Sequence, residues 1–355
     1  MLTSLDMHYL TKELQQIKTA RISKIYSFAD GTAIVFQLHI KNKPKLFFII
    51  FPPDFLFLTD EKPATDEELT PFAKILRKHI TNAIITDIEQ INFERILKLT
   101  VKKSTTFHLI VELFSKGNII LLDQEQKIIA ATLYKKWSTR VIAPGKTYSL
   151  PPPSPNIKSI TEKELTELIK KTNKDTLVKF LAADLCLGKK YAEEICITLD
   201  RNLHPSKINK TAILKELKKL LNKKLSPYVY FKNSTPVEFS PFKLNWLSKQ
   251  YSTKKTDSLS EAIRLVAEAK KQPKEPKEIT RLKRIISNQE KTITELEEKI
   301  KLNQEKANLI YQHFNEIKEI ISLAKEKRFA ELKKDPKVKR INMKEKKVLI
   351  EISKS

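Results

Sequence analysis

The feature that most constrains this chain is an apolar pattern with a seven-residue period between Pro276 and Pro336. Apolar or small side chains recur there at alternating spacings of three and four residues, with the polar Gln289 and Asn303 among them. The pattern predicts a coiled-coil helix about 70 Å long over residues 278–328. Its seam is formed by Ile279, Leu282, Ile286, Ile293, Leu296, Ile300, Ile310, Phe314, Ile317 and Ile321.

A lone helix cannot bury so narrow a stripe, so a second helix is expected to cover it. The sequence contains no second heptad run. The partner is therefore expected to be either a second copy of the chain or another chain that supplies the missing helix. Gln289 and Asn303 would then fix the register of the pair.

The first 150 residues show a different pattern. Short β-rich runs such as "TAIVFQLHI" and "KLFFIIF" are separated by turn residues, and the runs 84–91, 95–101, 107–114 and 119–122 follow an amphipathic helix. Residues 1–150 are therefore predicted to be an α+β domain built on an antiparallel sheet.

The proline-rich "PPPSPN" at 151–156 predicts a domain boundary, since proline interrupts both strands and helices. Helical patterns follow, and Gly188 separates two of them. The two alternatives are a helix-hairpin-helix, a motif that offers backbone N–H groups to phosphates, and a plain corner between two helices. We predict a helical domain at 151–250, a linker at 251–277 and, after the coiled coil, part of a further domain at 329–355. Lys189 and Lys190 beside Gly188 are RNA-binding candidates, as are Lys135 and Lys136.

Charge points to a polyanionic partner. Lys and Arg number 67 against 42 Asp and Glu, a net charge of +25, so nucleic acid is the favoured class of ligand. A lysine-rich proteome would also give part of this excess. No stretch long and apolar enough to span a membrane and no secretion signal is recognisable, so a cytoplasmic protein is expected.

Recognisable catalytic and metal-binding patterns are missing from the sequence. It has six His, two Cys and four Gly, and contains no phosphate-binding loop, no dinucleotide fingerprint and no metal-ligand spacing. We therefore expect a binding protein that needs no cofactor or metal and is not itself an enzyme.

The stretch "EQINFERILKLTV" places Glu94 and Arg95 where a strand begins. Arg95 is in line with the apolar Leu97, Leu99 and Val101, while Glu94 falls on the wetter face. A guanidinium stays charged and needs a partner there. The alternatives are a carboxylate, as in a structural ion pair with Glu94, a run of carbonyls, and the phosphate of a ligand.

Eight segments together resemble the NFACT family of ribosome quality-control factors, which includes the RqcH proteins, along essentially the whole chain. They are, in the family's order, "MLTSLDMHYLTKEL", "ARISKIY", "PFAKILRKHI", "IEQINFERI", "VELFSKGNIILLD", "TRVIAPGKTY", "LGKKYAEEI" and "SLSEAI". The resemblance implies binding to stalled large ribosomal subunits and to tRNA, with alanyl-tRNA as the candidate. It also implies template-free alanine tailing in which the ribosome forms the bonds.

The resemblance also implies site residues. The family's Asp-Arg pair falls on Glu94 and Arg95, so the carboxylate is kept but lengthened by one methylene, and tRNA binding is expected to be retained more fully than tailing. The family's other motifs fall on Arg77, Lys78, Gly117, Asn118 and Arg140.

Full-length members continue through a returning coiled-coil helix, which implies that this chain is the N-terminal part of a split protein. The alternative function is an RNA-binding or coiled-coil scaffold without tailing activity.

Overall fold

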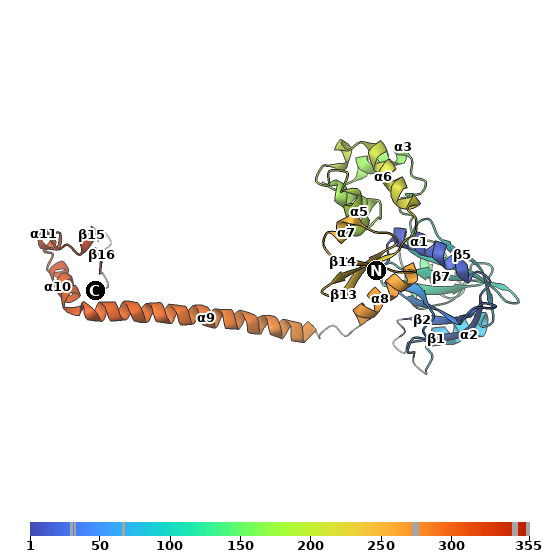
Figure 1. The fold of residues 1–355 in the computed structure, drawn as a ribbon, viewed down its shortest axis with the longest axis horizontal. Coiled ribbons are helices and arrows are strands. Elements are labelled where there is room, and N and C mark those ends of the chain that lie inside the picture. Colours follow the sequence, from blue (N-terminus) through green and yellow to red (C-terminus); the bar gives the residue numbers. More distant parts are fainter. Residues whose placement is uncertain (29–30, 32, 66–67, 272–276, 343–346, 353–355) are drawn as a thin grey trace. The chain divides into compact units, whose positions relative to one another are not determined.

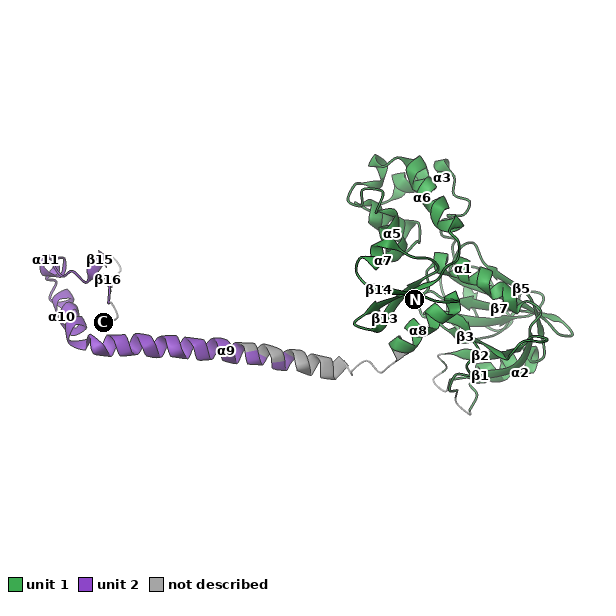
Figure 2. Ribbon diagram, in the orientation of Figure 1, with its two compact units in different colours: residues 1–272 green, residues 273–355 purple. Residues whose placement is uncertain are grey.

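The computed structural model describes residues 1–355 except 29–30, 32, 66–67, 272–276, 343–346 and 353–355. Side chains at 271–284, 287–288 and 291 also lie outside the described part, and with them the predictions for Ile279 and Leu282. The chain forms two compact units, Met1–Gln272 and Pro273–Ser355 (Figure 2).

The first unit is built on a nine-stranded antiparallel sheet in the order β4-β3-β2-β1-β5-β6-β7-β8-β9 (Figure 1). This confirms the predicted α+β fold with a large antiparallel sheet. The strands are β1 (Arg21–Ser27), β2 (Ile34–His39), β3 (Leu46–Phe51), β4 (Phe55–Thr59), β5 (Ile84–Gln90), β6 (Ile96–Lys102), β7 (Thr106–Glu112), β8 (Asn118–Leu122) and β9 (Ile128–Ala131).

Strand β6 shows how the sequence forms this sheet. Leu97, Leu99 and Val101 are buried in the main core, as their alternation predicts. Ile96 is buried as well, because a second apolar cluster that contains Ile110 covers the other face. The sheet is therefore packed on both faces at β6.

Short helices and strands complete this unit. They are α1 (Ser4–Leu14), η1 (Gln15–Ile17), α2 (Pro71–Ile80), β10 (Lys135–Lys136), β11 (Val141–Ile142), α3 (Glu162–Lys171), α4 (Leu177–Lys179), η2 (Phe180–Asp184), α5 (Lys189–Ile195), η3 (Pro205–Lys207), α6 (Lys210–Asn222), β12 (Tyr228–Lys232), β13 (Thr235–Ser240), α7 (Asn245–Ser248), β14 (Ser252–Lys255) and α8 (Leu259–Lys271). A turn that contains Gly188, with φ of 74°, separates η2 from α5, at the predicted position.

The structure corrects the predicted linker at 251–277. Most of that segment is folded: β14 pairs with β12, and α8 packs against β4 and β13. Leu259, Ile263 and Val266 are buried, because their helical spacing gives α8 an apolar face. Glu13 caps this helix, since its carboxylate accepts hydrogen bonds from the backbone N of Leu259 at 2.6 Å and of Ser260 at 3.0 Å. The predicted segments 1–150 and 151–250 likewise share one core.

The second unit contains α9 (Lys277–Gln312), α10 (Phe314–Lys325), α11 (Phe329–Leu332) and the hairpin of β15 (Val338–Asn342) and β16 (Lys347–Ile350). The prediction of one uninterrupted helix over 278–328 is wrong, since the helix ends at Gln312 and His313 takes φ −104° and ψ 21°. Beyond His313 the chain packs on itself: α10 contacts α11 and its Ile320 is buried. The last turns of the predicted coiled coil, beyond His313, therefore pack against other residues of the second unit.

The seam on α9 remains uncovered within the described part of the chain. Ile286, Ile293, Leu296, Ile300 and Ile310 are each more than half exposed, at 51% to 56%. Such a row of large apolar side chains on one long helix is unusual for a surface that faces only water. The packing of a second helix against it is still a prediction.

Candidate nucleic-acid interface

Glu94 and Arg95 lie in the turn between β5 and β6, before the regular pleat begins at Ile96. Asn92 and Phe93 have φ of 47° and 58°, a left-handed conformation that reverses the chain. Phe93 is buried and anchors the turn. Because the pair precedes the pleat, its two side chains are not forced onto opposite faces of the sheet.

No ion pair joins Glu94 to Arg95 in the described structure, so the ion-pair alternative is wrong as an account of the pair. The Glu94 carboxylate instead accepts a hydrogen bond from the backbone N of Ser154 at 2.7 Å. Arg95 Nη1 donates to the Sδ of Met1 at 2.8 Å, a weak acceptor. Burial lowers the pKa of Arg95, and nearby groups including Glu94 oppose this effect. The guanidinium is thus a half-buried cation without a carboxylate at ion-pair distance.

A cavity of about 510 Å³ opens beside this pair. Its lining comes from the start of the chain, the proline-rich segment and the turn before α5, together with Glu94 and Arg95. The lining residues are Met1, Leu2, Thr3, Ser4, Glu94, Arg95, Phe114, Pro151, Pro152, Ser154, Ala182, Ala183, Cys186 and Gly188. The predicted boundary segment and the predicted hairpin turn therefore belong to one site with the Glu-Arg pair.

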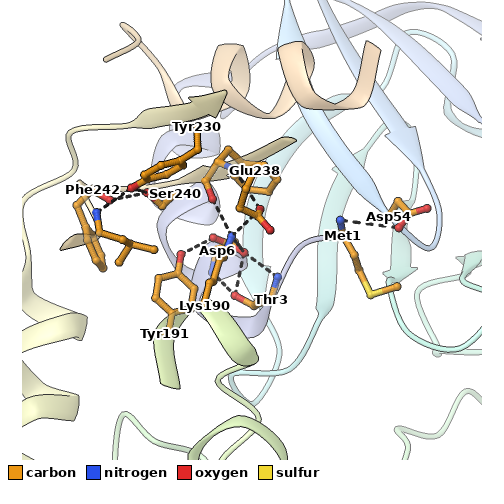
Figure 3. Close-up of polar contacts among 12 residues, drawn as sticks. Met1, Thr3, Asp6, Asp54, Lys190, Tyr191, Tyr230, Glu238, Ser240 and Phe242 are labelled. Carbon is orange, nitrogen blue, oxygen red and sulfur yellow. Dashed lines mark hydrogen bonds and ion pairs between the residues drawn. The ribbon is translucent and has the colours of Figure 1, made fainter. Parts of the chain in front are cut away.

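Lys190 does not face solvent, which corrects its assignment as an RNA contact. Its Nζ lies 2.9 Å from Oδ2 of Asp6 and donates to the carbonyl O of Phe239 at 2.8 Å (Figure 3). Tyr191 OH donates to the other oxygen of Asp6 at 2.5 Å, and Thr3 N donates to Oδ2 at 2.8 Å. The ammonium is buried because Asp6, at the start of α1, supplies the charge that it needs.

Asp6 was not among the predicted site residues, although the sequence contains a signal for it. Thr3 and Asp6 form a capping box at the start of α1, and "TSLD" is a recognisable form of it. The interaction of Asp6 with Lys190 and Tyr191 joins α1 to α5. Gly188 is close to the same cap, since a Cβ there would lie 3.0 Å from Cγ2 of Thr3. This network therefore holds one wall of the cavity against α1.

Arg140 is also buried, so the prediction that it contacts RNA directly is corrected as well. Its Nη1 and Nη2 donate to the two carboxylate oxygens of Glu112 at 2.5 and 2.9 Å. Its guanidinium carbon lies 4.8 Å from the ring centre of Trp137, and Tyr148 OH donates to Glu112 at 2.9 Å. A two-pronged pair of this kind orients both side chains. Arg140 is a structural residue that ties β7 to the segment around β11.

Gly117 and Asn118 have structural roles as well. A Cβ on Gly117, where φ is 74°, would lie 2.4 Å from Cβ of Pro52, so only glycine fits. Asn118 is buried, and its side chain donates to the carbonyl O of Leu133 at 2.8 Å and accepts from Leu133 N at 3.0 Å. The expectation that Asn118 contacts RNA is corrected accordingly.

The other candidates are exposed but scattered. Arg77 and Lys78 lie in the last turn of α2, with Arg77 Nε donating to the carbonyl O of Ile25 at 2.8 Å. Lys135 and Lys136 form β10, and Lys189 begins α5. None of these five is among the cavity's lining residues. They can add to a positive surface, whereas the cavity itself holds Glu94 and Arg95.

Two further observations concern the kind of site. Cys186 and Cys196 are free thiols, and among the described residues no group of His, Cys, Asp and Glu is arranged to hold a metal ion. Within the same part of the chain, no helix has the length and apolar character that crossing a membrane requires.

The sequence model of one protein family, described as NFACT N-terminal and middle domains, matches residues 3–355. The archaeal Rqc2 homologue aRqcH of Methanocaldococcus jannaschii is 27% identical over 356 residues, covering 92% of this chain and 52% of that protein. Ribosome quality control complex subunit 2 of Saccharomyces cerevisiae is 34% identical over 133 residues, covering 36% of this chain and 12% of that protein. The chain thus spans about half the length of the archaeal relative.

A solved structure has a similar fold over about three quarters of the chain. It is the N-terminal part of the fibronectin/fibrinogen-binding protein of Streptococcus suis, with a TM-score of 0.60 and 24% identity. The match covers 76% of this chain and 99% of that chain. At this level of identity the similarity concerns the fold alone.

Proposed function

Since the chain belongs to the NFACT family, whose sequence model matches residues 3–355, we propose that it acts in ribosome-associated quality control. In this proposal it binds the large ribosomal subunit and a tRNA, with alanyl-tRNA as the candidate. It supports tailing of the stalled chain while the ribosome forms the peptide bonds. The general role is supported by its similarity to the archaeal Rqc2 homologue and to the yeast ribosome quality control complex subunit 2.

The observation that carries the RNA-binding part of the proposal is the burial and the charge environment of Arg95. A half-buried guanidinium without a carboxylate partner, in a cavity of about 510 Å³, is suited to an anionic ligand. Arg in particular recognises phosphate through paired N–H donors. The net charge of +25 supports a polyanion as the ligand. Glu94, fixed by the Ser154 amide, would orient the RNA beside it.

Co-sedimentation with purified large ribosomal subunits tests the proposal. We expect the chain to pellet with the subunits at about 50 mM salt and to be largely released by about 200 mM, because contacts with several phosphates weaken at least tenfold over this range. Vacant subunits and subunits that carry a peptidyl-tRNA should be compared, with the latter binding more tightly. Binding to neither, or binding that salt does not weaken, would contradict the proposal and favour the scaffold alternative.

We further propose that the seam of α9 binds a helix of another chain or of a second copy. Its exposed Ile293, Leu296 and Ile300 need such a cover. A separate chain that carries the returning helix would make the protein one half of a split factor. A purified chain that stays monomeric with α9 fully helical would contradict this proposal.

Placing a charge on the seam should abolish association through α9. Ile300→Glu puts a carboxylate at a position that is 56% exposed now and would become buried in the pair. Leu302→Glu is the matched control, since Leu302 is 51% exposed but lies off the seam. We expect the first change to raise the dissociation constant of the pair, or to lower the amount of co-purified partner, by at least tenfold, while the second has little effect. Equal effects would show that the seam is not the interface.

A further inference from the structure

Two basic side chains lie beside Phe93, two residues before Arg95, and a third lies close to them. The His8 and Phe93 ring centres are 5.9 Å apart, and Nζ of Lys158 lies 5.6 Å from the Phe93 ring centre. Lys12 completes the group, with its Nζ 4.8 Å from the ring of Tyr9, which in turn contacts His8 at 5.4 Å.

The group joins two parts of the chain. His8 and Lys12 are four residues apart on α1 and so share one face of that helix. Lys158 follows the proline-rich segment whose Ser154 amide holds Glu94. Lys12 and Lys158 are exposed, whereas Phe93 is buried and lies beneath Lys158. The group therefore adjoins the turn that carries Glu94 and Arg95.

No acidic side chain balances this group among the described residues. None of the three side chains forms an ion pair there, and the neighbouring charges that act on His8 and Lys158 are all positive. Burial, and then Lys158 and Lys12, lower the pKa of His8 from 6.5 to about 4. Burial and then Lys12 lower the pKa of Lys158. The protein thus places the two ammonium groups of Lys12 and Lys158 beside a His8 ring that is neutral near pH 7, at a cost that a bound anion would relieve.

We infer that His8, Lys12 and Lys158 form a phosphate-binding site that holds the RNA backbone beside the Glu94–Arg95 cavity. The inference rests on the proposed function, because it takes the phosphate to be part of the same RNA. Two flexible ammonium groups and an imidazole are suited to a phosphate as charge and hydrogen-bond donors. The shared turn at Phe93 and Arg95 places this site and the cavity within reach of neighbouring parts of one strand. Free inorganic phosphate has the same chemistry, so the test must separate it from RNA.

The first test measures tRNA binding to the full chain as a function of salt. The double variant Lys12→Gln, Lys158→Gln should bind at least tenfold more weakly at low salt, and the slope of log K against log salt should fall by about 1.5. The matched control is Lys249→Gln, Lys255→Gln, which removes the same charge from exposed lysines elsewhere on the unit. An equal loss in the two variants would overturn the inference.

The second test follows the His8 ring by NMR in the unmodified chain between pH 4 and 7, so it needs no variant to fold. A bound phosphate should raise the pKa of His8 from about 4 toward its ordinary value, and we expect tRNA to do so. If inorganic phosphate raises it but tRNA does not, the RNA assignment is overturned.

The same measurements separate this inference from the proposed function. If tRNA binds, and Arg95→Ala weakens it, while the pKa of His8 stays unchanged, the phosphate site is wrong and the proposed function stands. If tRNA does not bind at all, both fail. A rise in the pKa of His8 with tRNA, lost in the lysine double variant, supports the site.

Discussion

Replacing Lys190 with Met should lower the free energy of unfolding of residues 1–272 by about 3–5 kcal/mol. The Asp6 side chain is 0% exposed and the Lys190 side chain 7%, so the change leaves a carboxylate buried without its cation. Tyr191 and Thr3 still donate to Asp6 but cannot neutralise it. Urea unfolding followed by tryptophan fluorescence measures the effect, because Trp137 and Trp246, the chain's two tryptophans, both lie in this unit.

Lys189→Met is the matched control, since Lys189 is the exposed neighbour on the same helix. It should change the free energy of unfolding by no more than about 0.5 kcal/mol. Asp6→Asn combined with Lys190→Met should cost less than the sum of the two single changes, because Lys190→Met strands Asp6 and Asp6→Asn leaves the ammonium with only Glu238, 3.4 Å away, as its charged partner. A loss below about 1 kcal/mol for Lys190→Met would show that the ammonium is not held as the structure has it.

The burial of Lys190 and Arg140 marks the limit of what the sequence could predict. Both are basic residues beside recognisable motifs, so a surface role was the reasonable prediction. Their partners, Asp6 and Glu112, are remote in sequence and come close only through packing. The sign of a charge can be known from sequence, but its partner depends on tertiary structure. Patterns among neighbouring residues do not identify a partner that is remote in sequence.

Periodic patterns predicted burial more successfully than the basic residues predicted surface roles, because a period depends only on residues that are close in sequence. The alternation in β6 predicted which of its residues are buried, apart from Ile96, which the second apolar cluster covers. The helical spacing in α8 was equally visible in the sequence, yet residues 251–277 were predicted to be a linker. The break at His313 could not be predicted, because Phe314 and Ile317 continue the heptad spacing while α10 follows a local core.

Some features of the candidate site could be predicted from sequence, and others depend on tertiary structure. The resemblance to the NFACT family singled out Glu94 and Arg95, and the alternation placed Arg95 in line with the apolar face, where a guanidinium is expected to need a partner. The left-handed turn at Asn92 and Phe93 and the hydrogen bond from Ser154 could not be predicted, since both depend on how the turn meets the proline-rich segment. The same is true of the basic group around Phe93.

Arg95→Ala should weaken tRNA binding by tenfold or more, since a charge-assisted hydrogen bond to phosphate contributes about 1.5–3 kcal/mol. The free energy of unfolding should change by less than about 1 kcal/mol, because Arg95 has no carboxylate partner that its removal would strand. Filter binding of tRNA at several salt concentrations, with urea unfolding of the same variant, measures both quantities. The slope of log K against log salt should fall by about 1 as well.

Two conservative variants decide what Arg95 contributes. Arg95→Lys keeps the charge but loses the paired donors, so an intermediate loss of affinity would indicate that a phosphate is bound through the fork of the guanidinium. Glu94→Asp should preserve or raise activity if the geometry of the family applies, and its shorter side chain should still accept a hydrogen bond in the turn. Equal losses of affinity and stability in Arg95→Ala would contradict the RNA-binding assignment. In that case Arg95 would have a structural role in the turn, and the cavity beside it would need another ligand.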